Sequence, residues 1–272
     1  MPIKSISSRD NALYKELKHL ATNSQARRKA QRTLLDGVHL CEAYLQHRGV
    51  PPLCIVSEAS LMHHEVAPIV KRCEANTIAG ATQCISLPES LYQALSQVDN
   101  GVGLLFIIDT PQENFQEPLN VSAVLLDNVQ DPGNLGSILR SAAAAGIAHV
   151  FCSLGTASAW SPKVLRAGMG VHFLLHIHEN FDLASLMRNA KVPVLATSSH
   201  VSHRIFDVDL SKDIAWLFGH EGQGVDPALL ALATNKVTIP HLGQVESLNV
   251  AACAAVCFFE QVRQRVVSGL KQ

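Results

Sequence analysis

The sequence predicts an α/β protein, with a mostly parallel sheet covered by helices on both faces in the second half and a small α/β sandwich domain before it. Short apolar runs alternate with helical patterns, which is typical of βαβ units. Hydrophobic residues make up 47% of the 272 residues and charged residues 17%, as expected of a well-packed, ordered protein. A chain of this length fits two ordinary domains better than one large one.

The front half predicts a domain over residues 1–110. Leu13, Leu17 and Leu20 share one face of a helix expected over 11–20. Later segments predict strands over 33–36, 53–57, 83–87 and 103–108, and helices over 38–47, 66–75 and 88–97. Residues 111–120 are polar and aperiodic and contain two prolines, so we expect a linker there.

The second predicted domain covers residues 121–272. Strands are expected over 123–127, 149–152, 174–178, 194–197, 216–219 and 236–239, and helices over 135–145, 162–167, 183–189 and 227–233. A long apolar helix follows, beginning near Leu248. In parallel sheets of this kind, ligands bind at the carboxyl ends of the strands.

Composition argues against several classes of protein. No apolar run reaches the roughly 18 residues that a membrane-spanning helix needs, and the start of the chain lacks the apolar core of a signal peptide. The seven cysteines include no Cys-x-x-Cys pair and fit reduced thiols in a cytoplasmic protein. Cys253 and Cys257 share a helix face, where packing explains them better than metal binding. The 13 histidines show no ligand spacing, so no metal site is expected.

The first forty residues form a basic arm. They carry eight Lys or Arg against three Asp or Glu, a net charge of +5 on a chain whose total is −1. Such an arm fits a polyanionic partner, and on charge alone a solvated helix face explains it about equally well.

The loop from Asp131 to Asn134 follows an apolar strand and is ordinary turn chemistry. Arg140, six residues after Asn134, is less ordinary, because an arginine in an apolar helix needs a partner. That partner could be Asp127, Glu221 or a substrate phosphate.

Two later loops also carry polar residues. Three glycines surround Glu221 in a loop that by itself is a glycine turn with an exposed acid, and it matches neither the dinucleotide fingerprint nor a phosphate-binding loop. Ser247 and Asn249 stand at the start of the long apolar helix. They could hold a polar ligand or a phosphate, but helix capping is the commoner role of such residues.

Taken together and in this order, the three loops resemble the three sequence motifs of the SpoU/TrmH branch of the SPOUT superfamily of RNA methyltransferases. The resemblance covers about residues 121–265. The matched positions are the turn 131–134, Gly136 and Arg140; Gly219, Glu221, Gly222 and Gly224; and Ile239, Pro240, Gly243, Ser247, Leu248, Asn249 and Val250. More weakly, the front half resembles the RNA-binding substrate domain that often precedes this catalytic domain.

The resemblance implies a deep trefoil knot in the catalytic domain and a homodimer that uses the final helix. It implies an S-adenosylmethionine pocket built from Leu217, Phe218, Gly219, Glu221, Gly222, Ile239, Pro240, Ser247, Leu248 and Asn249. The residues expected to contact RNA are Arg9, Asn11, Lys15, Arg27, Arg28 and Arg140.

The implied reaction is methylation of a ribose 2′-oxygen in 23S ribosomal RNA or tRNA. The implied catalytic residues are Arg140, Asn134, Glu221, Ser247 and Asn249. Family precedent gives Arg140 the task of activating the hydroxyl, but a guanidinium keeps its proton and could equally grip a phosphate and stabilise the developing alkoxide. Asn134, Ser247 and Asn249 would orient the nucleotide, whereas Glu221 would hold its loop and pair with Arg140.

Two rival functions follow from the same residues. A non-catalytic protein that binds structured RNA and keeps the fold is the main alternative. A Rossmann dehydrogenase is the other, but the segment after Leu126 lacks the glycine fingerprint that such an enzyme needs. His220 and His241 stand at loop positions that vary across the family that the sequence resembles, so no role is assigned to them.

Overall fold

The computed structural model describes residues 3–77, 82–98, 101–116, 118–198, 201, 203–244 and 247–269. The chain divides into two compact units. The first consists of Met1–Pro111 and Trp160–Phe173, and the second of Gln112–Ala159 and Leu174–Gln272. Of the predicted linker, residues 112–116 and 118–120 form neither helix nor strand, and Glu117 lies outside the described residues.

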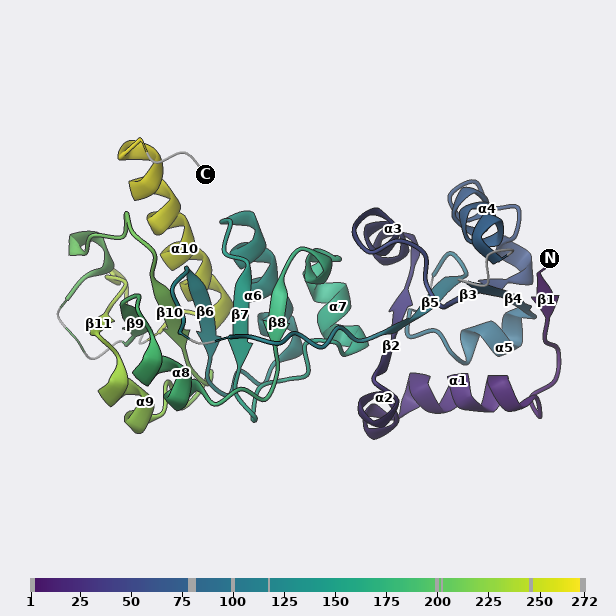
Figure 1. Cartoon of the computed structure of the whole chain (residues 1–272), viewed down its shortest axis with the longest axis horizontal. Helices are drawn as coiled ribbons and strands as arrows, with labels where there is room; N and C mark the ends of the chain where they lie inside the picture. The colour runs from purple at the N-terminus through teal and green to yellow at the C-terminus, as the bar shows by residue number, and fades with distance from the viewer. Residues whose placement is uncertain are drawn as a thin grey trace. The chain divides into compact units, whose positions relative to one another are not determined.

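The first unit is a five-stranded sheet with helices on both faces. The strand order is β1-β4-β3-β5-β2, and β5 runs antiparallel to both of its neighbours. Helices α1 and α5 pack on one face, whereas α3 and α4 lie on the other (Figure 1). The strands are β1 (Lys4–Ser5), β2 (Arg32–Asp36), β3 (Leu53–Ser57), β4 (Gln83–Leu87) and β5 (Leu104–Asp109). The helices are α1 (Ala12–Thr22), α2 (Ser24–Ala30), α3 (Val38–His47), α4 (Val66–Thr77), α5 (Glu89–Gln93) and α7 (Pro162–Gly168).

The segment Trp160–Phe173 joins the first unit, although it lies within the range that the sequence assigns to the second domain. The Thr33 hydroxyl donates to the Trp160 carbonyl at 2.6 Å, across 127 positions of the chain. The Arg166 guanidinium donates to the Gln97 carbonyl. Such long-range polar contacts leave no periodic signal in the sequence.

The second unit is built on a six-stranded, wholly parallel sheet. Its strand order is β11-β9-β10-β6-β7-β8. Helices α6 and α10 lie on one face and α8 and α9 on the other (Figure 1). The strands are β6 (Ala123–Leu126), β7 (His149–Cys152), β8 (His176–His178), β9 (Val194–Thr197), β10 (Ala215–Phe218) and β11 (Asn235–Val237). The helices are α6 (Pro132–Ala144), α8 (Leu183–Asn189), α9 (Pro227–Leu232) and α10 (Val250–Val267).

The predicted α/β class with a mostly parallel sheet is confirmed, and the differences are local. Helix α6 begins at Pro132 rather than 135 because the Asp131 carboxylate caps it by accepting from the Asn134 amide at 2.8 Å. Helix α10 begins at Val250 because Asn249 caps it. The sequence missed β1 and α2; α2 buries none of its residues and so has no apolar periodicity. The trefoil knot stays a prediction.

No helix in the described part of the chain is both long and apolar enough to cross a membrane.

Candidate active site

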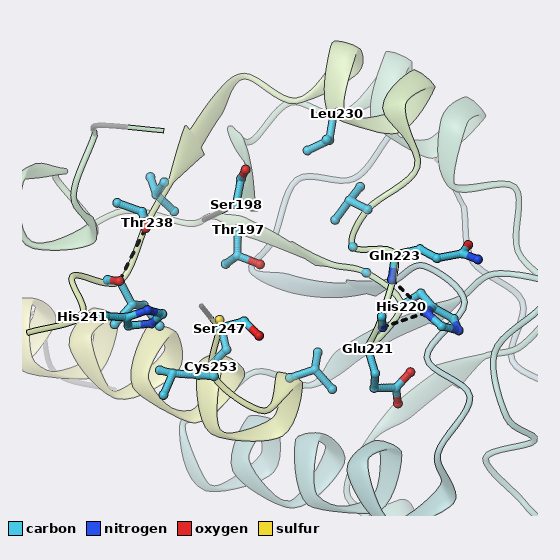
Figure 2. Close-up of a pocket in the computed structure, with 18 residues that line it drawn as sticks. Thr197, Ser198, His220, Glu221, Gln223, Leu230, Thr238, His241, Ser247 and Cys253 are labelled. Atoms are coloured by element: carbon cyan, nitrogen blue, oxygen red, sulfur yellow. Dashed lines mark hydrogen bonds between the residues drawn. The ribbon is translucent and has the colours of Figure 1, made fainter. Parts of the chain in front are cut away.

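A cavity of about 660 Å³ lies at the carboxyl ends of β9, β10 and β11, beside the start of α10. Its size falls in the range of small-molecule sites, roughly 300–1,000 Å³. Figure 2 shows Thr197 of β9 above Ser247 and Cys253 at the start of α10. The lining residues are Thr197, Ser198, Gly219, His220, Glu221, Gly222, Gln223, Gly224, Val225, Leu230, Val237, Thr238, Ile239, His241, Ser247, Leu248, Val250 and Cys253.

Gly219 allows the loop after β10 to fold back on itself. A Cβ atom at this position would lie 2.2 Å from the Gly224 carbonyl carbon and 2.2 Å from the Val225 nitrogen. No side chain fits in that space, so the close approach of the loop to the end of β10 requires glycine.

Three side chains from the three loops form one chain of hydrogen bonds. The Glu221 carboxylate accepts from the Asn134 side-chain amide at 3.0 Å. The Asn134 carbonyl oxygen accepts from the Asn249 amide at 2.9 Å. Asn249 in turn accepts from the backbone amides of Ala251 and Ala252 at 2.9 and 3.2 Å. We call Glu221, Asn134 and Asn249 the polar relay; it joins the loop after β10, which lines the cavity, to the first turn of α6 and to the start of α10.

Of the two roles open for Asn249, capping is observed: the side-chain oxygen caps α10, and the side-chain nitrogen donates to Asn134. The groups at the two ends of the polar relay fix the orientations of the Asn134 and Asn249 side-chain amides. A carboxylate only accepts, so Glu221 requires the Asn134 nitrogen, and the helix amides only donate, so they require the Asn249 oxygen.

Glu221 is charged in this arrangement. Partial burial raises the pKa of its carboxyl, but hydrogen bonds from Asn134 and from the Asp131 and Gln130 backbone amides outweigh the burial, so the pKa lies below the usual value. The carboxylate therefore stabilises the loops at neutral pH, and this contribution is lost only as the pH falls through the lowered pKa.

Arg140 is exposed on α6, and neither predicted carboxylate pairs with it among the described residues. Glu221 binds Asn134, as above, and the Asp127 carboxylate accepts from the Asp226 backbone amide at 2.8 Å. The Glu221–Arg140 pair that the sequence suggested is not formed in the described residues, where each of the two carboxylates accepts from other donors. A substrate phosphate is the remaining candidate from the sequence.

Six of the predicted cofactor residues line the cavity: Gly219, Glu221, Gly222, Ile239, Ser247 and Leu248. The side chains of Leu217 and Phe218 lie in the core, fully buried. Pro240 and Asn249 are not among the lining residues. Asn249 is connected to the site through its hydrogen bond to Asn134.

The sequence missed several lining residues, notably Thr197, Ser198, Thr238 and Cys253. Thr197 ends β9 and no motif marks it. The rule that ligands bind at the carboxyl ends of parallel strands would have found it. His220 and His241, which the sequence left without a role, also line the cavity.

The predicted RNA-contacting residues of the first unit are not equivalent. Asn11 caps α1 by accepting from the Leu13 and Tyr14 amides, and Lys15 pairs with Asp10 at 3.0 Å. The Arg27 guanidinium donates to the Leu20 and Ala21 carbonyls at the end of α1. Arg9 and Arg28 are exposed.

The described residues contain no group of three or more His, Cys, Asp or Glu side chains placed to hold a metal ion.

The sequence profile of the SpoU rRNA Methylase family matches residues 121–259. The chain belongs to this family. Among its SpoU relatives, the 23S rRNA (guanosine(2553)-2′-O)-methyltransferase RlmP of Bacillus subtilis is 31% identical over 94% of this chain and 98% of its own length. An uncharacterized tRNA/rRNA methyltransferase of Synechocystis is 30% identical over 97% of this chain and 95% of its own length.

Solved structures agree with this family membership. An RNA 2′-O ribose methyltransferase is 29% identical, with a TM-score of 0.78 over 96% of this chain and 99% of that one. An AdoMet-bound rRNA methyltransferase from Sinorhizobium meliloti is 25% identical, with a TM-score of 0.81 over 96% and 98%. The predicted S-adenosylmethionine-dependent RNA methyltransferase of the SpoU family is thereby confirmed.

The polar relay can be tested at Asn249. Asn249→Asp keeps an oxygen that caps α10 but faces Asn134 with an acceptor in place of the donor. We expect stability near that of wild type and a methylation rate reduced about fivefold, since one hydrogen bond is worth about 1 kcal/mol. Asn249→Ala should lose the cap as well, which costs about 1 kcal/mol of unfolding free energy. Urea unfolding and methyl-transfer assays measure the two effects. Full activity in the Asp variant would contradict a role for the relay.

Proposed function

We propose that this protein transfers the methyl group of S-adenosylmethionine to a ribose 2′-oxygen of 23S ribosomal RNA. The polar relay carries the proposal, because it joins the three motifs, of which the second and third line one cavity. Ribosomal RNA is favoured over tRNA because RlmP matches nearly the whole chain, whereas the tRNA (guanosine(18)-2′-O)-methyltransferase of Thermus thermophilus matches 54% of it.

The cavity suits the cofactor. S-adenosylmethionine combines an aromatic base with a charged amino-acid chain. Val225, Leu230 and Val237 give the cavity apolar walls, and Thr197, Ser247 and the loop after β10 give it polar groups. The tight turn that Gly219 allows brings backbone groups of that loop to the cavity. We assign the cofactor to Gly219, Glu221, Gly222, Ile239, Ser247 and Leu248, with Asn249 in support.

The cofactor would supply an electrophilic methyl group and leave as the neutral thioether. The ribose oxygen gains the methyl group and loses its proton to solvent, so the protein has to align the hydroxyl and stabilise charge on its oxygen. Arg140 performs the second task. A guanidinium is protonated and has no lone pair to accept a proton, so Arg140 acts as an electrostatic anchor for the developing alkoxide and a neighbouring phosphate. Gly133, Ser137, Arg140 and Ala144 form the exposed side of α6, where RNA has access. Asn134 and Glu221 position this helix start.

Arg140→Ala tests the assignment. We expect an unchanged dissociation constant for S-adenosylmethionine and a transfer rate at least about a hundredfold lower, the usual effect of losing one donor to a developing oxyanion. The measurement follows tritiated methyl transfer to 23S ribosomal RNA and to tRNA in parallel.

Arg188→Ala is the matched control, because Arg188 is exposed on α8 and its loss changes the charge equally. Transfer by the Arg140 variant at the wild-type rate would refute the role of Arg140. Methyl transfer to tRNA but not to 23S ribosomal RNA would refute 23S ribosomal RNA as the substrate. Binding of 23S ribosomal RNA without any methyl transfer would favour the non-catalytic alternative.

The first unit is proposed to bind RNA through the exposed basic residues of α2 and its surroundings. Arg28→Ala combined with Lys29→Ala should weaken RNA binding. The slope of the logarithm of the RNA-binding constant against the logarithm of the salt concentration should fall by about 1.5 in magnitude, because two fewer phosphate contacts mean that fewer counterions are released when RNA binds. Arg27 is unsuitable for this test because it holds the end of α1.

The control for this test is Arg48→Ala with Lys71→Ala, which removes two exposed charges at α3 and α4, on the other face of the same sheet. Filter binding at several salt concentrations measures both variants. An unchanged slope in the α2 variant would place the RNA elsewhere.

We further propose a homodimer formed through α10. Val256, Phe259 and Val266 are exposed, and with Ala252 and Arg263 they recur every three or four residues along one face of the helix. Phe259→Glu should therefore yield a monomer in light scattering.

Phe206→Glu is the control for the dimer test, because Phe206 is 53% exposed and Phe259 is 49% exposed. A dimer that persists in the Phe259 variant would contradict the proposed interface. None of the seven cysteines, all of which the structure describes, forms a disulfide, and we propose a cytoplasmic location on this ground.

A further inference from the structure

His220 begins the loop that follows β10, and this loop is closed by its own backbone. The His220 amide donates to the Gly224 carbonyl at 3.0 Å, and the Gly224 amide donates to the His220 carbonyl at 2.8 Å. All five residues from His220 to Gly224 line the cavity. The shape of this loop therefore determines one wall of the cofactor site.

The imidazole of His220 fastens the inside of the same loop. Its Nδ1 atom accepts from the Gly222 amide at 2.9 Å and from the Gln223 amide at 3.1 Å (Figure 2). Two backbone N–H groups directed at one ring nitrogen require that nitrogen to carry no proton. The ring proton must then sit on Nε2, because neutral imidazole has one donor and one acceptor nitrogen. A doubly protonated ring has no acceptor, so it would repel both amides.

Opening of the loop would affect the polar relay as well as the cavity wall. Glu221 lies between the bridged ends of the loop, and its carboxylate anchors the polar relay to Asn134. Loss of the two bonds to Nδ1 would release the backbone amides of Gly222 and Gln223 and so loosen the chain directly beside Glu221.

We propose that His220 is a positioning residue whose neutral Nε2–H form holds the cofactor loop closed, and that protonation of His220 weakens the binding of S-adenosylmethionine. The identity of the ligand rests on the function proposed above, whereas the tautomer and the closed loop do not. The protein then binds its methyl donor less tightly in acid than in weakly basic solution, because a protonated Nδ1 cannot accept the two amides.

Other titratable groups face the loop and must be separated from His220. On the loop itself, hydrogen bonding lowers the pKa of Glu221 below its usual range, so it stays charged there. Asp226 and Asp127 accept backbone amides beyond the loop. Across the cavity stand Cys253 of α10, whose pKa is lowered by a hydrogen bond with Cys257, and His241. His241 is the group that shares the chemistry of His220, so it provides the matched control.

The test uses His220→Asn, because the asparagine oxygen stands two bonds from Cβ, as Nδ1 does, accepts hydrogen bonds and does not titrate. Isothermal titration of S-adenosylmethionine into the whole protein between about pH 8 and 5 gives the dissociation constants. We expect wild-type affinity to fall with pH and His220→Asn to stay near the affinity that wild type shows at high pH. His220→Ala should bind about tenfold more weakly throughout, as expected for the net loss of two hydrogen bonds. His241→Asn should keep the wild-type fall.

Nitrogen NMR of the histidine rings in the free protein gives a second measurement that needs no ligand. We expect an unprotonated Nδ1 in His220 at high pH. A proton on Nδ1 at high pH would overturn the proposal. So would a fall in the affinity of His220→Asn equal to that of wild type, or a wild-type affinity that does not change with pH. Wild type that binds no S-adenosylmethionine at any pH, but shows the expected tautomer, would instead count against the proposed function.

Discussion

The carboxamide of Asn134 is the point on which the second unit depends. Its nitrogen donates to the Glu221 carboxylate, which can only accept. Its oxygen accepts from the side-chain nitrogen of Asn249, and the Asn249 oxygen accepts from the backbone amides at the start of α10. Because neither neighbour can exchange roles, the amide has one orientation, and a satisfied polar network of this kind specifies a single arrangement. The turn before α6, the loop after β10 and the start of α10 are thereby held as one body.

The fold explains why these three segments can meet. All strands of the second sheet are parallel, so their carboxyl ends lie at a common edge, and each following loop emerges there. Helices α6 and α10 cover the same face of the sheet, which brings their first turns close together. The absence of a side chain at Gly219 lets the loop after β10 turn back far enough to point Glu221 at them. Polar groups thus converge without burial of an unpaired charge.

Much of this organisation could be predicted from the sequence, because it rests on local rules. The strand and helix pattern gave the α/β class, and the spacing of the loops gave the family. Side-chain partners could not be predicted in the same way. The composition of α6 suggested that Arg140 needs a partner, either an internal carboxylate or a substrate phosphate, and its position on the helix leaves it exposed. Arg27 looked like a surface charge because α2, which turns it toward the end of α1, has no apolar period. Thr197 was not predicted as a lining residue of the cavity because the end of a strand carries no sequence motif.

The hydrogen bond between Asn249 and Asn134 spans 115 positions, and this has a consequence for biosynthesis. Contacts of such separation form late, since much of the intervening chain must be ordered first. Helix α10 leaves the ribosome after every other element of the site, so a nascent chain that still lacks it has an incomplete catalytic centre. Competence for catalysis thus requires that α10 has been synthesised and packed beside α6.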